Sequence, residues 1–428
     1  MPIPVQCPDC GFSKSVADTF AGKAVKCKSC GGRIPVPAGT DDDKEAPRST
    51  SSRTGRPNRS AKSSIKSPAK SNTPWVIIGI MCTGGLVTAI ICAGIAFSVF
   101  SQAKSGQWSN THNGNRDPSL LPSPAEPAGS SPSLSLTDLS TVPIPSFPPL
   151  GEPIETFSDS GVKLYFVDFN SVPGNNPVGG QMKMRVYIPS GTHDPGTLPC
   201  VLVGPAGTNL LTGCDMDADD YHEETLPYAE AGMVTVFYSL DGGIDDIETI
   251  ENYELTKAYR QFRSAHAGVM NGRNALEFIL AQVPSVNPKK IYCAGHSSAG
   301  TLSLLLAARE PRIAACAAYA PATDVEARLA EVLQDPAANL VLPGIRAFLK
   351  DSSPKNHLDE YHCPVFLFHA ADDDNVPISD PTAFYGSLIA KGKTAKLETV
   401  AHGGHYQPMI DEGIPRAIRW FQSLPPAE

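Results

Sequence analysis

The sequence predicts that residues 151–428 form an α/β domain built on a mostly parallel sheet of eight strands, with helices on both faces. Short apolar or alternating runs recur along this segment, and helix-like stretches separate most of the later runs. Several runs are continuous in Val, Ile, Leu and Phe, which is typical of strands buried on both faces. Strands that alternate with helices in this way predict a parallel sheet, because the connecting helices cover its faces.

Each predicted element follows from its own apolar pattern. The predicted strands are residues 161–169, 181–189, 198–204, 232–240, 289–295, 313–320, 363–370 and 396–402. The predicted helices are residues 217–231, 267–283, 299–310, 380–392 and 414–424. The first two strands follow each other without a helix. In sheets of this kind, functional sites gather at the carboxyl ends of the strands.

Residues 1–36 are predicted to form a zinc ribbon. The spacing is Cys-x2-Cys-x16-Cys-x2-Cys, with a glycine directly after each pair. Zinc holds four thiolates in a tetrahedron, and the glycine lets the chain fold back over the metal. Because a segment this short cannot build a hydrophobic core, the structural zinc would supply its folding energy. Two redox-active cysteine pairs, or thiols without a function, are the alternative. The predicted ligands are Cys7, Cys10, Cys27 and Cys30.

The segment resembles the small N-terminal zinc-ribbon motif that precedes membrane spans in many bacterial proteins, including planctomycete proteins. Residues 37–74 are rich in Ser, Lys, Arg and Pro, which predicts a disordered basic linker. Residues 75–100 form a run of 26 residues without a charged side chain. A transmembrane helix needs roughly 20 apolar residues, so this run is predicted to be one. A cleaved signal peptide is the alternative, but its apolar core has only about 7–15 residues and lies near the N-terminus. Residues 101–150, rich in Ser, Pro, Asn and Gly, are predicted to be a flexible stalk.

The charges around the predicted span indicate its orientation. Eight Lys and Arg residues lie between Lys44 and Lys70, whereas only Lys104 and Arg116 lie in the first stretch after the span. The more basic flank stays in the cytoplasm. We therefore expect a single-pass protein of the inner (cytoplasmic) membrane, with the zinc ribbon in the cytoplasm and the large domain on the periplasmic side. Zinc thiolates also persist best in a reducing compartment.

The two ends of the chain carry opposite charge. Residues 1–74 contain 13 Lys and Arg against 6 Asp and Glu, a net charge of +7. Residues 151–428 contain 20 against 35, a net charge of −15. A domain this acidic is not expected to bind nucleic acid as its main ligand. Cys200 and Cys214 flank one loop of this domain, and export would allow a disulfide between them.

The stretch "IYCAGHSSAG" has the strand, sharp turn and helix that a nucleophile elbow requires. The turn is so tight that the residues two positions before and after the nucleophile must be small. Ser297 has Gly295 and Ala299 at these positions, whereas Ser298 has His296 before it, which would crowd the turn. Ser297 is therefore the predicted nucleophile, and its hydroxyl is expected to cap the following helix. A capped helix start without catalysis is the alternative.

An acid and a histidine follow the elbow in the chain order of a Ser–acid–His triad. A serine hydroxyl is a poor nucleophile until a histidine takes its proton, and a carboxylate fixes the tautomer of that histidine. Candidates follow two strands, "ADDDNVPISD" after residues 363–370 and "HGGHYQP" after the strand that begins at residue 396. Both loops are expected at the same sheet edge as the elbow. The order alone leaves open which aspartate and which histidine act.

These motifs resemble the catalytic domain of prolyl oligopeptidase-type peptidases and related α/β-hydrolase esterases. The resemblance extends over roughly residues 180–425, is strongest at the elbow and the two loops, and implies an α/β-hydrolase fold. The family pattern H-G-x-x-D-x-x-V-P implies that the acid is Asp373, with His369 as its first residue and alanine in place of the glycine. The family histidine usually follows glycines and precedes an aromatic residue, which implies His405 rather than His402.

The resemblance implies no catalytic role for the two aspartates that flank Asp373. Asp372 and Asp374 are expected to be solvated neighbours. A calcium site built from the three consecutive carboxylates is the alternative.

The oxyanion hole needs two backbone N–H groups aimed at the developing charge. Ser298, which follows the nucleophile, is expected to supply one. The second is expected from the loop after residues 198–204, where the family usually has H-G-G and this chain has Gly-Pro-Ala-Gly. Because Pro205 has no N–H, Ala206 or Gly207 must donate.

These residues together predict a membrane-anchored serine hydrolase that acts through an acyl-enzyme on small ester or peptide substrates, with no cofactor for the chemistry. Peptidases of the family usually carry a β-propeller ahead of the catalytic domain, and this chain has only the stalk, which favours a carboxylesterase over a serine peptidase. A non-catalytic binding or sensor protein on the same scaffold is the alternative from another class. Nucleic-acid binding by the ribbon is a third hypothesis, although charge near a span is more simply a topology signal.

Overall fold

The structure is a computed structural model, and contacts divide the chain into two units, residues 1–81 and residues 82–428. It describes residues 3–6, 8, 13–16, 24–26, 33–37, 139, 142–171, 180–216, 221–244 and 250–425.

The first unit contains two antiparallel strand pairs, and the buried residues described there are all apolar: Val5, Val25, Ile34 and Val36. The pairs are β1 (Ile3–Gln6) with β2 (Ser13–Val16), and β3 (Ala24–Lys26) with β4 (Arg33–Pro35). In the sequence, each Cys-x2-Cys pair falls between the two strands of one of these pairs. The four cysteines themselves lie outside the described residues.

The second unit is built on a nine-stranded sheet with the order β13-β12-β11-β10-β8-β9-β7-β6-β5. The strands from β13 to β9 are parallel, and β7, β6 and β5 are antiparallel to their neighbours. The prediction of a mostly parallel sheet is confirmed, and the predicted number of strands is one too low because β5 has only two residues and shows no pattern. The strands are β5 (Glu155–Thr156), β6 (Lys163–Asn170), β7 (Gln181–Ile188), β8 (Leu198–Val203), β9 (Val234–Tyr238), β10 (Val286–His296), β11 (Ile313–Tyr319), β12 (Val365–Ala370) and β13 (Ala395–Val400).

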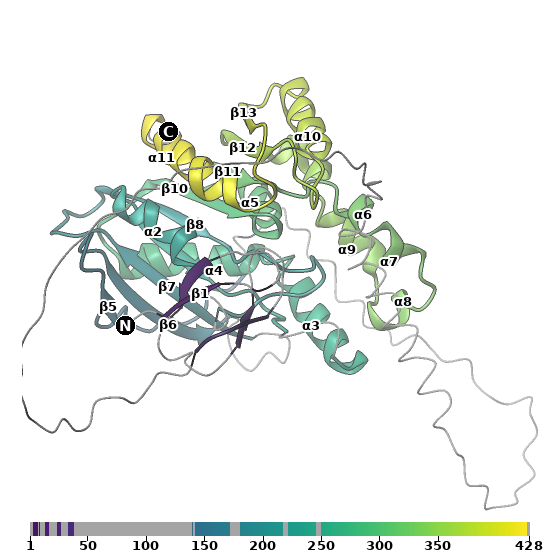
Figure 1. Cartoon of the computed structure of the whole chain (residues 1–428), viewed down its shortest axis with the longest axis horizontal. Helices are drawn as coiled ribbons and strands as arrows, with labels where there is room; N and C mark the ends of the chain where they lie inside the picture. Colours follow the sequence, from purple (N-terminus) through teal and green to yellow (C-terminus); the bar gives the residue numbers. More distant parts are fainter. Residues whose placement is uncertain are drawn as a thin grey trace, which may run out of the picture. The chain divides into compact units, whose positions relative to one another are not determined.

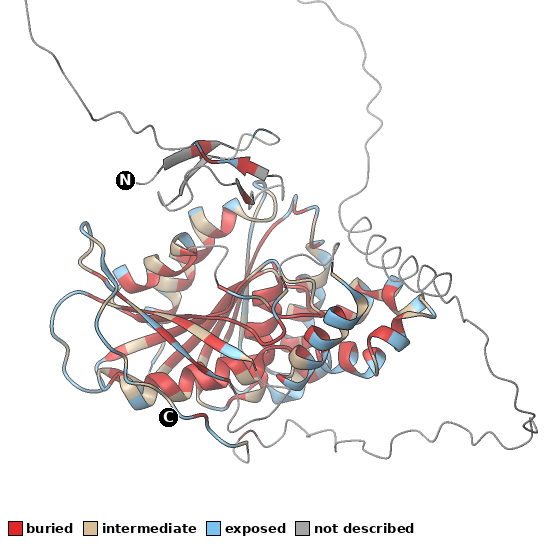
Figure 2. Cartoon of the chain, turned by 90° about the horizontal axis from the view of Figure 1, so that it is seen from below, coloured by how far each residue is buried: buried red, intermediate tan, exposed pale blue. Residues whose placement is uncertain are grey.

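Helices cover both faces of this sheet, which forms the buried centre of the domain in Figure 2. Alternate strand residues enter two separate cores, as in β10, where Cys293 faces one core and Tyr292 the other. The first core includes residues of α3 (Asn252–Ser264), α4 (Val269–Gln282), α5 (Ser298–Arg309) and α10 (Ser379–Ala390). The second includes residues of α2 (His222–Glu230) and α11 (Ile414–Ser423), and Figure 1 shows these helices over the sheet. A short π-helical turn, η5 (Met409–Gly413), leads into α11.

The sequence patterns did not predict several helices. Five short ones lie between β11 and β12, and Figure 1 shows four of them, α6 to α9, together at one side of the domain. They are α6 (Val325–Arg328), α7 (Ala330–Gln334), α8 (Ala338–Val341), α9 (Ile345–Asp351) and the 3-10 helix η4 (Pro354–Glu360). Segments of this length are too short to show a helical period. Helix α3 does carry a signal, because its buried Leu255, Tyr259 and Phe262 are spaced as one helical face.

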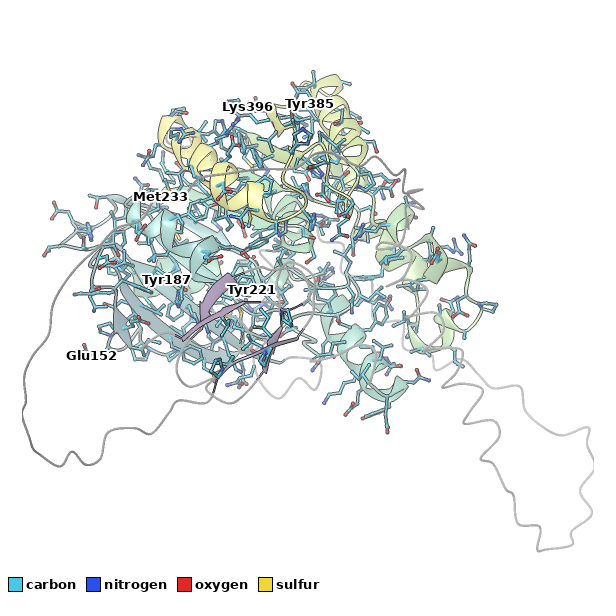
Figure 3. All side chains as sticks on the ribbon, viewed as in Figure 1. Glu152, Tyr187, Tyr221, Met233, Tyr385 and Lys396 are labelled. Carbon is cyan, nitrogen blue, oxygen red and sulfur yellow. The ribbon has the colours of Figure 1, made fainter. Side chains whose placement is uncertain are left out.

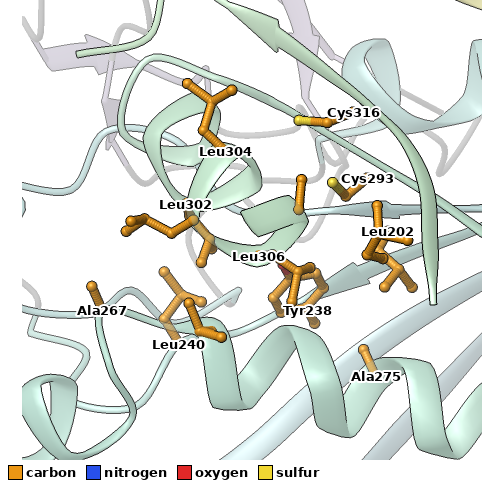
Figure 4. Packing of buried hydrophobic residues seen from close by; sticks show 14 of the residues in the cluster. Leu202, Tyr238, Leu240, Ala267, Ala275, Cys293, Leu302, Leu304, Leu306 and Cys316 are labelled. Carbon is orange, nitrogen blue, oxygen red and sulfur yellow. The ribbon is translucent and has the colours of Figure 1, made fainter. Parts of the chain in front are cut away.

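Helices α4 and α5 pack closely, and a glycine makes this approach possible. A Cβ atom on Gly272 of α4 would lie 2.7 Å from Cδ2 of Leu306 and 3.1 Å from the hydroxyl of Tyr238. Figure 4 shows Leu306 and Leu302 of α5 among Tyr238 of β9 and Cys293 of β10. The carboxyl end of β10 and the start of α5, which carry the predicted nucleophile, are therefore supported by a packed core.

The packed domain of the second unit begins before the predicted boundary at residue 151. Leu139 is buried, and the Phe147 ring packs edge-on against Phe169 at 5.1 Å and Phe278 at 5.6 Å. The guanidinium of Arg273 also donates a hydrogen bond to the Val142 carbonyl at 2.9 Å. The prediction of a flexible stalk as far as residue 150 is therefore wrong for the last residues of that segment. Their apolar side chains, although scattered in the sequence, pack into the core.

Two further predictions concern export and the membrane. Cys200 is a free thiol buried in β8, so it forms no disulfide with Cys214. Within the part of the chain that the structure describes, no helix has the length and apolar character of a membrane span. The predicted span at residues 75–100 lies outside that part.

Candidate active site

A strained serine lies between β10 and α5. Ser297 has φ of 54° and ψ of −120°, a conformation that residues other than glycine rarely adopt. Its N–H donates to the Tyr319 carbonyl at 2.8 Å, and its carbonyl accepts from the N–H of Thr301 at 3.0 Å. Strain of this kind costs roughly 1–3 kcal/mol and is concentrated at functional sites.

The hydroxyl of Ser297 does not cap α5, and in this respect the prediction is wrong. Ser297 occupies the N-cap position but its side chain accepts no capping hydrogen bond. Capping side chains normally belong to residues with extended backbone, and Ser297 has a positive φ instead. The side chain is therefore not committed to the helix.

The packing of the elbow explains why its flanking residues are small. A Cβ atom on Gly295 would lie 2.4 Å from the carbonyl oxygen of Ala299, and Ala299 is itself fully buried. Ser298 is also buried, and its Oγ accepts a hydrogen bond from the Thr208 N–H at 3.1 Å. Of the two neighbouring serines, Ser297 is the more exposed and has the strained backbone.

An aspartate after β12 contacts a histidine after β13. Nδ1 of His405 lies 2.7 Å from Oδ2 of Asp373. Since a carboxylate oxygen accepts, Nδ1 carries the proton and Nε2 is left with a lone pair. Nε2 is buried and has no hydrogen-bond partner among the described residues. The serine–histidine hydrogen bond is thus not formed here, and such bonds often tighten only when substrate is bound.

The carboxylate of Asp373 is fully buried and receives four hydrogen bonds. Its Oδ1 accepts from the N–H groups of Asn375 at 2.9 Å and Val376 at 3.0 Å. Its Oδ2 is shared between His405 and Nε2 of His369, the latter at 3.2 Å. Nε2 of His369 is also 2.8 Å from the Val376 carbonyl, which can only accept, so this nitrogen carries a proton.

These contacts keep Asp373 charged. Burial alone would raise the pKa of Asp373, but the hydrogen bonds from His369 and His405 and the charge of His405 outweigh it. The pKa is held well below its usual range. Asp373 therefore remains an anion that can stabilise a positive charge on His405.

The remaining candidates in the two loops lie apart from this pair. His402 is exposed and its Nδ1 is 3.4 Å from Oδ2 of Asp372. Asp372 also accepts hydrogen bonds from the N–H groups of Gly403 at 3.1 Å and Gly404 at 2.9 Å. Asp372 is exposed, as predicted for a solvated neighbour, and its two hydrogen bonds to the histidine loop are an additional contact that the sequence did not indicate. Asp374 is exposed.

The three consecutive aspartates do not converge. No cluster of His, Cys, Asp and Glu side chains that could hold a metal ion occurs among the described residues, and this includes the aspartate loop. The alternative of a calcium site there is not supported.

The predicted oxyanion loop lies beside the elbow. Thr208 of this loop donates to Ser298, as described above, and the Tyr221 hydroxyl donates to the Ala206 carbonyl at 2.9 Å (Tyr221 is labelled in Figure 3). Because the C=O and N–H of a trans peptide point in opposite directions, the Gly207 N–H points away from Tyr221. The tyrosine thereby orients the peptide that joins the two predicted donors, Ala206 and Gly207.

A small, mostly apolar pocket adjoins the oxyanion loop. Thr208 of this loop and Ser298 of the elbow line it, whereas Ser297 and His405 do not. Its lining residues are Thr208, Leu210, Leu240, Phe262, Ala267, Ser298, Thr301, Leu302, Leu305 and Ser352.

The sequence indicated no role for His296, and it indicated His369 only as the first residue of a motif. Both histidines are buried next to the Asp373–His405 pair. His296 contacts His405 across 109 positions of sequence, so no local spacing could have indicated the contact. For His369 the signal was its spacing of four residues from Asp373.

Several solved structures are similar to this chain. Acetyl xylan esterase from Paenibacillus sp. R4 is 17% identical with a TM-score of 0.48, and the alignment covers 63% of this chain and 87% of that chain. Acetyl xylan esterase 1 from Thermoanaerobacterium sp. JW/SL YS485 is 17% identical with a TM-score of 0.47, covering 67% and 90%. A puromycin-hydrolyzing peptidase of Mycobacterium tuberculosis is 19% identical with a TM-score of 0.46, covering 58% and 38%.

A family match covers the segment that holds the elbow and both loops. Residues 266–423 match the model of the prolyl oligopeptidase family. This segment includes Ser297, Asp373 and His405. The sheet order and the connections described above are those of an α/β-hydrolase-type fold. Residues 266–423 of the second unit are thus similar to the prolyl oligopeptidase family, and the protein is a serine hydrolase.

Proposed function

We propose that the protein is a carboxylesterase that forms an acyl-enzyme on Ser297. One observation carries the proposal: a buried, charged Asp373 holds Nδ1 of His405, while Nε2 is buried and without a partner. An imidazole held in this tautomer is a general base. Ser297, which has a strained backbone and forms no capping hydrogen bond, follows a strand of the same parallel sheet, and we assign it as the proton donor.

In the first step, Oγ of Ser297 attacks the acyl carbon of the substrate and transfers its proton to Nε2 of His405. Asp373 does not take this proton; it stabilises the imidazolium and keeps the ring oriented. The negative charge moves to the former carbonyl oxygen. We assign its stabilisation to the N–H of Ser298 and to that of Ala206 or Gly207.

When the tetrahedral intermediate collapses, the imidazolium of His405 donates its proton to the leaving group. A water molecule then enters, His405 removes its proton, and the resulting hydroxide attacks the acyl carbon. Collapse of the second intermediate releases the acid, and Oγ of Ser297 regains a proton from His405. No metal or organic cofactor enters these steps.

We favour esters over peptides because of the sequence that separates the predicted span from the domain. Only residues 101–138 lie between them, and this stretch, rich in Ser and Pro, lacks the regular strand pattern of a β-propeller. A serine peptidase remains the second candidate, because the family match is to the prolyl oligopeptidase family. The same acyl-enzyme chemistry would serve both.

A fluorophosphonate probe tests the mechanism, because it labels an activated serine covalently. We expect labelling of the wild type and of Ser298→Ala, and no labelling of Ser297→Ala. Labelling that persists in Ser297→Ala and disappears in Ser298→Ala would overturn the assignment of the nucleophile. If the wild type is not labelled at all, the result supports a non-catalytic sensor or binding protein.

A substrate panel separates the two enzymatic candidates. The panel consists of p-nitrophenyl esters of increasing acyl length and aminoacyl-proline amides. We expect turnover of the short esters, with kcat/KM highest for the smallest acyl groups. Hydrolysis of the amides in preference to the esters would establish the peptidase instead.

We further propose that residues 75–100 anchor the protein in the inner membrane, with the hydrolase domain outside the cytoplasm. The excess of Lys and Arg ahead of this segment supports the orientation. Protease added to spheroplasts should digest the hydrolase domain and spare the N-terminal unit; the reverse pattern would refute the orientation.

For the N-terminal unit we propose one structural zinc held by the four cysteines. The positions of the two Cys-x2-Cys pairs, each between two paired strands, support this proposal. Removal of zinc by a chelator should unfold this unit and leave esterase activity unchanged. A zinc content below one equivalent in the purified protein would argue against the site.

A further inference from the structure

A second histidine lies directly behind the proposed base. The His296 ring is buried, with 4% of its surface exposed, and its centroid is 4.6 Å from that of His405. Nε2 of His296 lies 2.7 Å from the backbone carbonyl oxygen of His405. A carbonyl can only accept, so Nε2 of His296 carries the proton and donates it.

This hydrogen bond joins the nucleophile and the base through a short path. His296 is the last residue of β10, and Ser297 follows it directly. We propose that His296 is a positioning residue that fixes the backbone of His405 relative to Ser297; the inference rests on the proposed acyl-enzyme function of these two residues.

The loop that carries His405 needs such a restraint. Gly403 and Gly404 precede the histidine with φ of 128° and 72°, so the loop approaches it through two glycines in left-handed conformations. Asp373 holds the ring of His405 at Nδ1, and Asp372 holds the N–H groups of the two glycines. Of these contacts, the hydrogen bond from His296 is the one that links the elbow to the backbone of His405.

A neutral donor suits this position. Burial, and then the charge of His405, lower the pKa of His296 to about 3. The ring is therefore uncharged under ordinary conditions and donates a hydrogen bond without adding a positive charge beside the imidazolium that forms during catalysis. The ring of Tyr406 packs edge-on against it at 5.5 Å and completes its enclosure.

A matched pair of variants separates positioning from simple packing. In His296→Gln, the amide nitrogen can reach the place of Nε2 and donate to the same carbonyl. His296→Met has nearly the same shape as His296→Gln but no donor. We expect His296→Gln to retain kcat within about fivefold. A misplacement on the order of 1 Å costs up to about 100-fold in rate, so we expect His296→Met to lose kcat by about 10- to 100-fold with KM little changed.

The rate constant for fluorophosphonate labelling of Ser297 should fall in parallel with kcat in His296→Met, because labelling requires the same base. Equal kcat in His296→Met and the wild type, with both folded as judged by thermal unfolding, would overturn the proposal. So would equal losses in the two variants, because the histidine would then act through its ring and not through the donor.

Folding failure does not leave the question open. If His296→Met does not fold, a folded and active His296→Gln supports the role of the donor, whereas a folded His296→Gln as inactive as Ser297→Ala overturns it. If neither variant folds, His296 is required for folding and the positioning role is rejected. A wild type without fluorophosphonate labelling would instead refute the proposed function, which distinguishes the two failures.

Discussion

Nδ1 of His405 lies 2.7 Å from Oδ2 of Asp373, although the two residues follow different strands and are 32 positions apart. The same carboxylate oxygen is 3.2 Å from Nε2 of His369, so two histidine rings converge on one buried anion. This arrangement leaves only Nε2 of His405 available for proton transfer. The loop that carries Asp373 therefore fixes the tautomer of the proposed base.

Asp373→Asn should lower kcat by about 1,000- to 10,000-fold and leave KM nearly unchanged. The asparagine occupies the same space, but its amide can present a donor to Nδ1 and favour the tautomer in which Nε2 is protonated. Steady-state hydrolysis of a p-nitrophenyl ester measures the effect. Retention of more than a tenth of the wild-type kcat would show that Asp373 does not orient the base.

The stability of the domain should depend on pH through Asp373. Its pKa is lower in the folded protein than the value of about 3.9 expected for an unfolded chain. The charged carboxylate therefore stabilises the fold fully above that value, and this stabilisation is lost as the pH falls through the folded pKa.

Urea unfolding of the wild type and Asp373→Asn at several pH values between 7 and 3 tests this dependence. We expect the difference in unfolding free energy between them to be constant above about pH 5 and to shrink below about pH 4. A difference that stays constant down to pH 3 would contradict the assigned pKa direction.

Ser298→Ala should destabilise the domain by about 1 kcal/mol, because the Thr208 N–H loses its acceptor. Thermal unfolding measures this loss. A suitable control is Ser303→Ala in the same helix, since the Ser303 hydroxyl donates to the Ala299 carbonyl, which a helical backbone bond also satisfies. The control should be less destabilised, and an equal loss would show that any buried hydroxyl in α5 has the same effect.

Gly295→Ala should disrupt the elbow, because the new Cβ would lie 2.4 Å from the Ala299 carbonyl oxygen. We expect loss of fluorophosphonate labelling and a clear drop in thermal stability. Gly386→Ala is the matched control: Gly386 is exposed in α10, and its added Cβ has no neighbour within 4 Å. This control should be more stable than the wild type by about 0.5–1 kcal/mol. Normal labelling of Gly295→Ala would mean that the elbow can widen.

The alternation of strands and helices in the second unit was predictable, and so was the elbow. The eight predicted strands all occur in the sheet, because runs such as "CPVFLFHA" are long and apolar enough to be distinctive. Helices α6 to α9 were not predictable, since four to seven residues do not show a period. The packing of residues 142–150 was missed because their composition resembles that of a linker, although Phe147 reaches the core.

The sequence by itself determined the class of the fold and the preference for Ser297 over Ser298, because both follow from interactions between near neighbours in the chain. Small residues on either side of Ser297 are a local steric requirement, and Gly295 and Ala299 satisfy it visibly in the sequence. Only the tertiary structure decided that Asp372 holds the glycines before His405, and that His296 donates to the carbonyl of His405. These contacts join strand-end loops that are distant in the chain, and the packing of the sheet, not the spacing of the residues, brings the loops together.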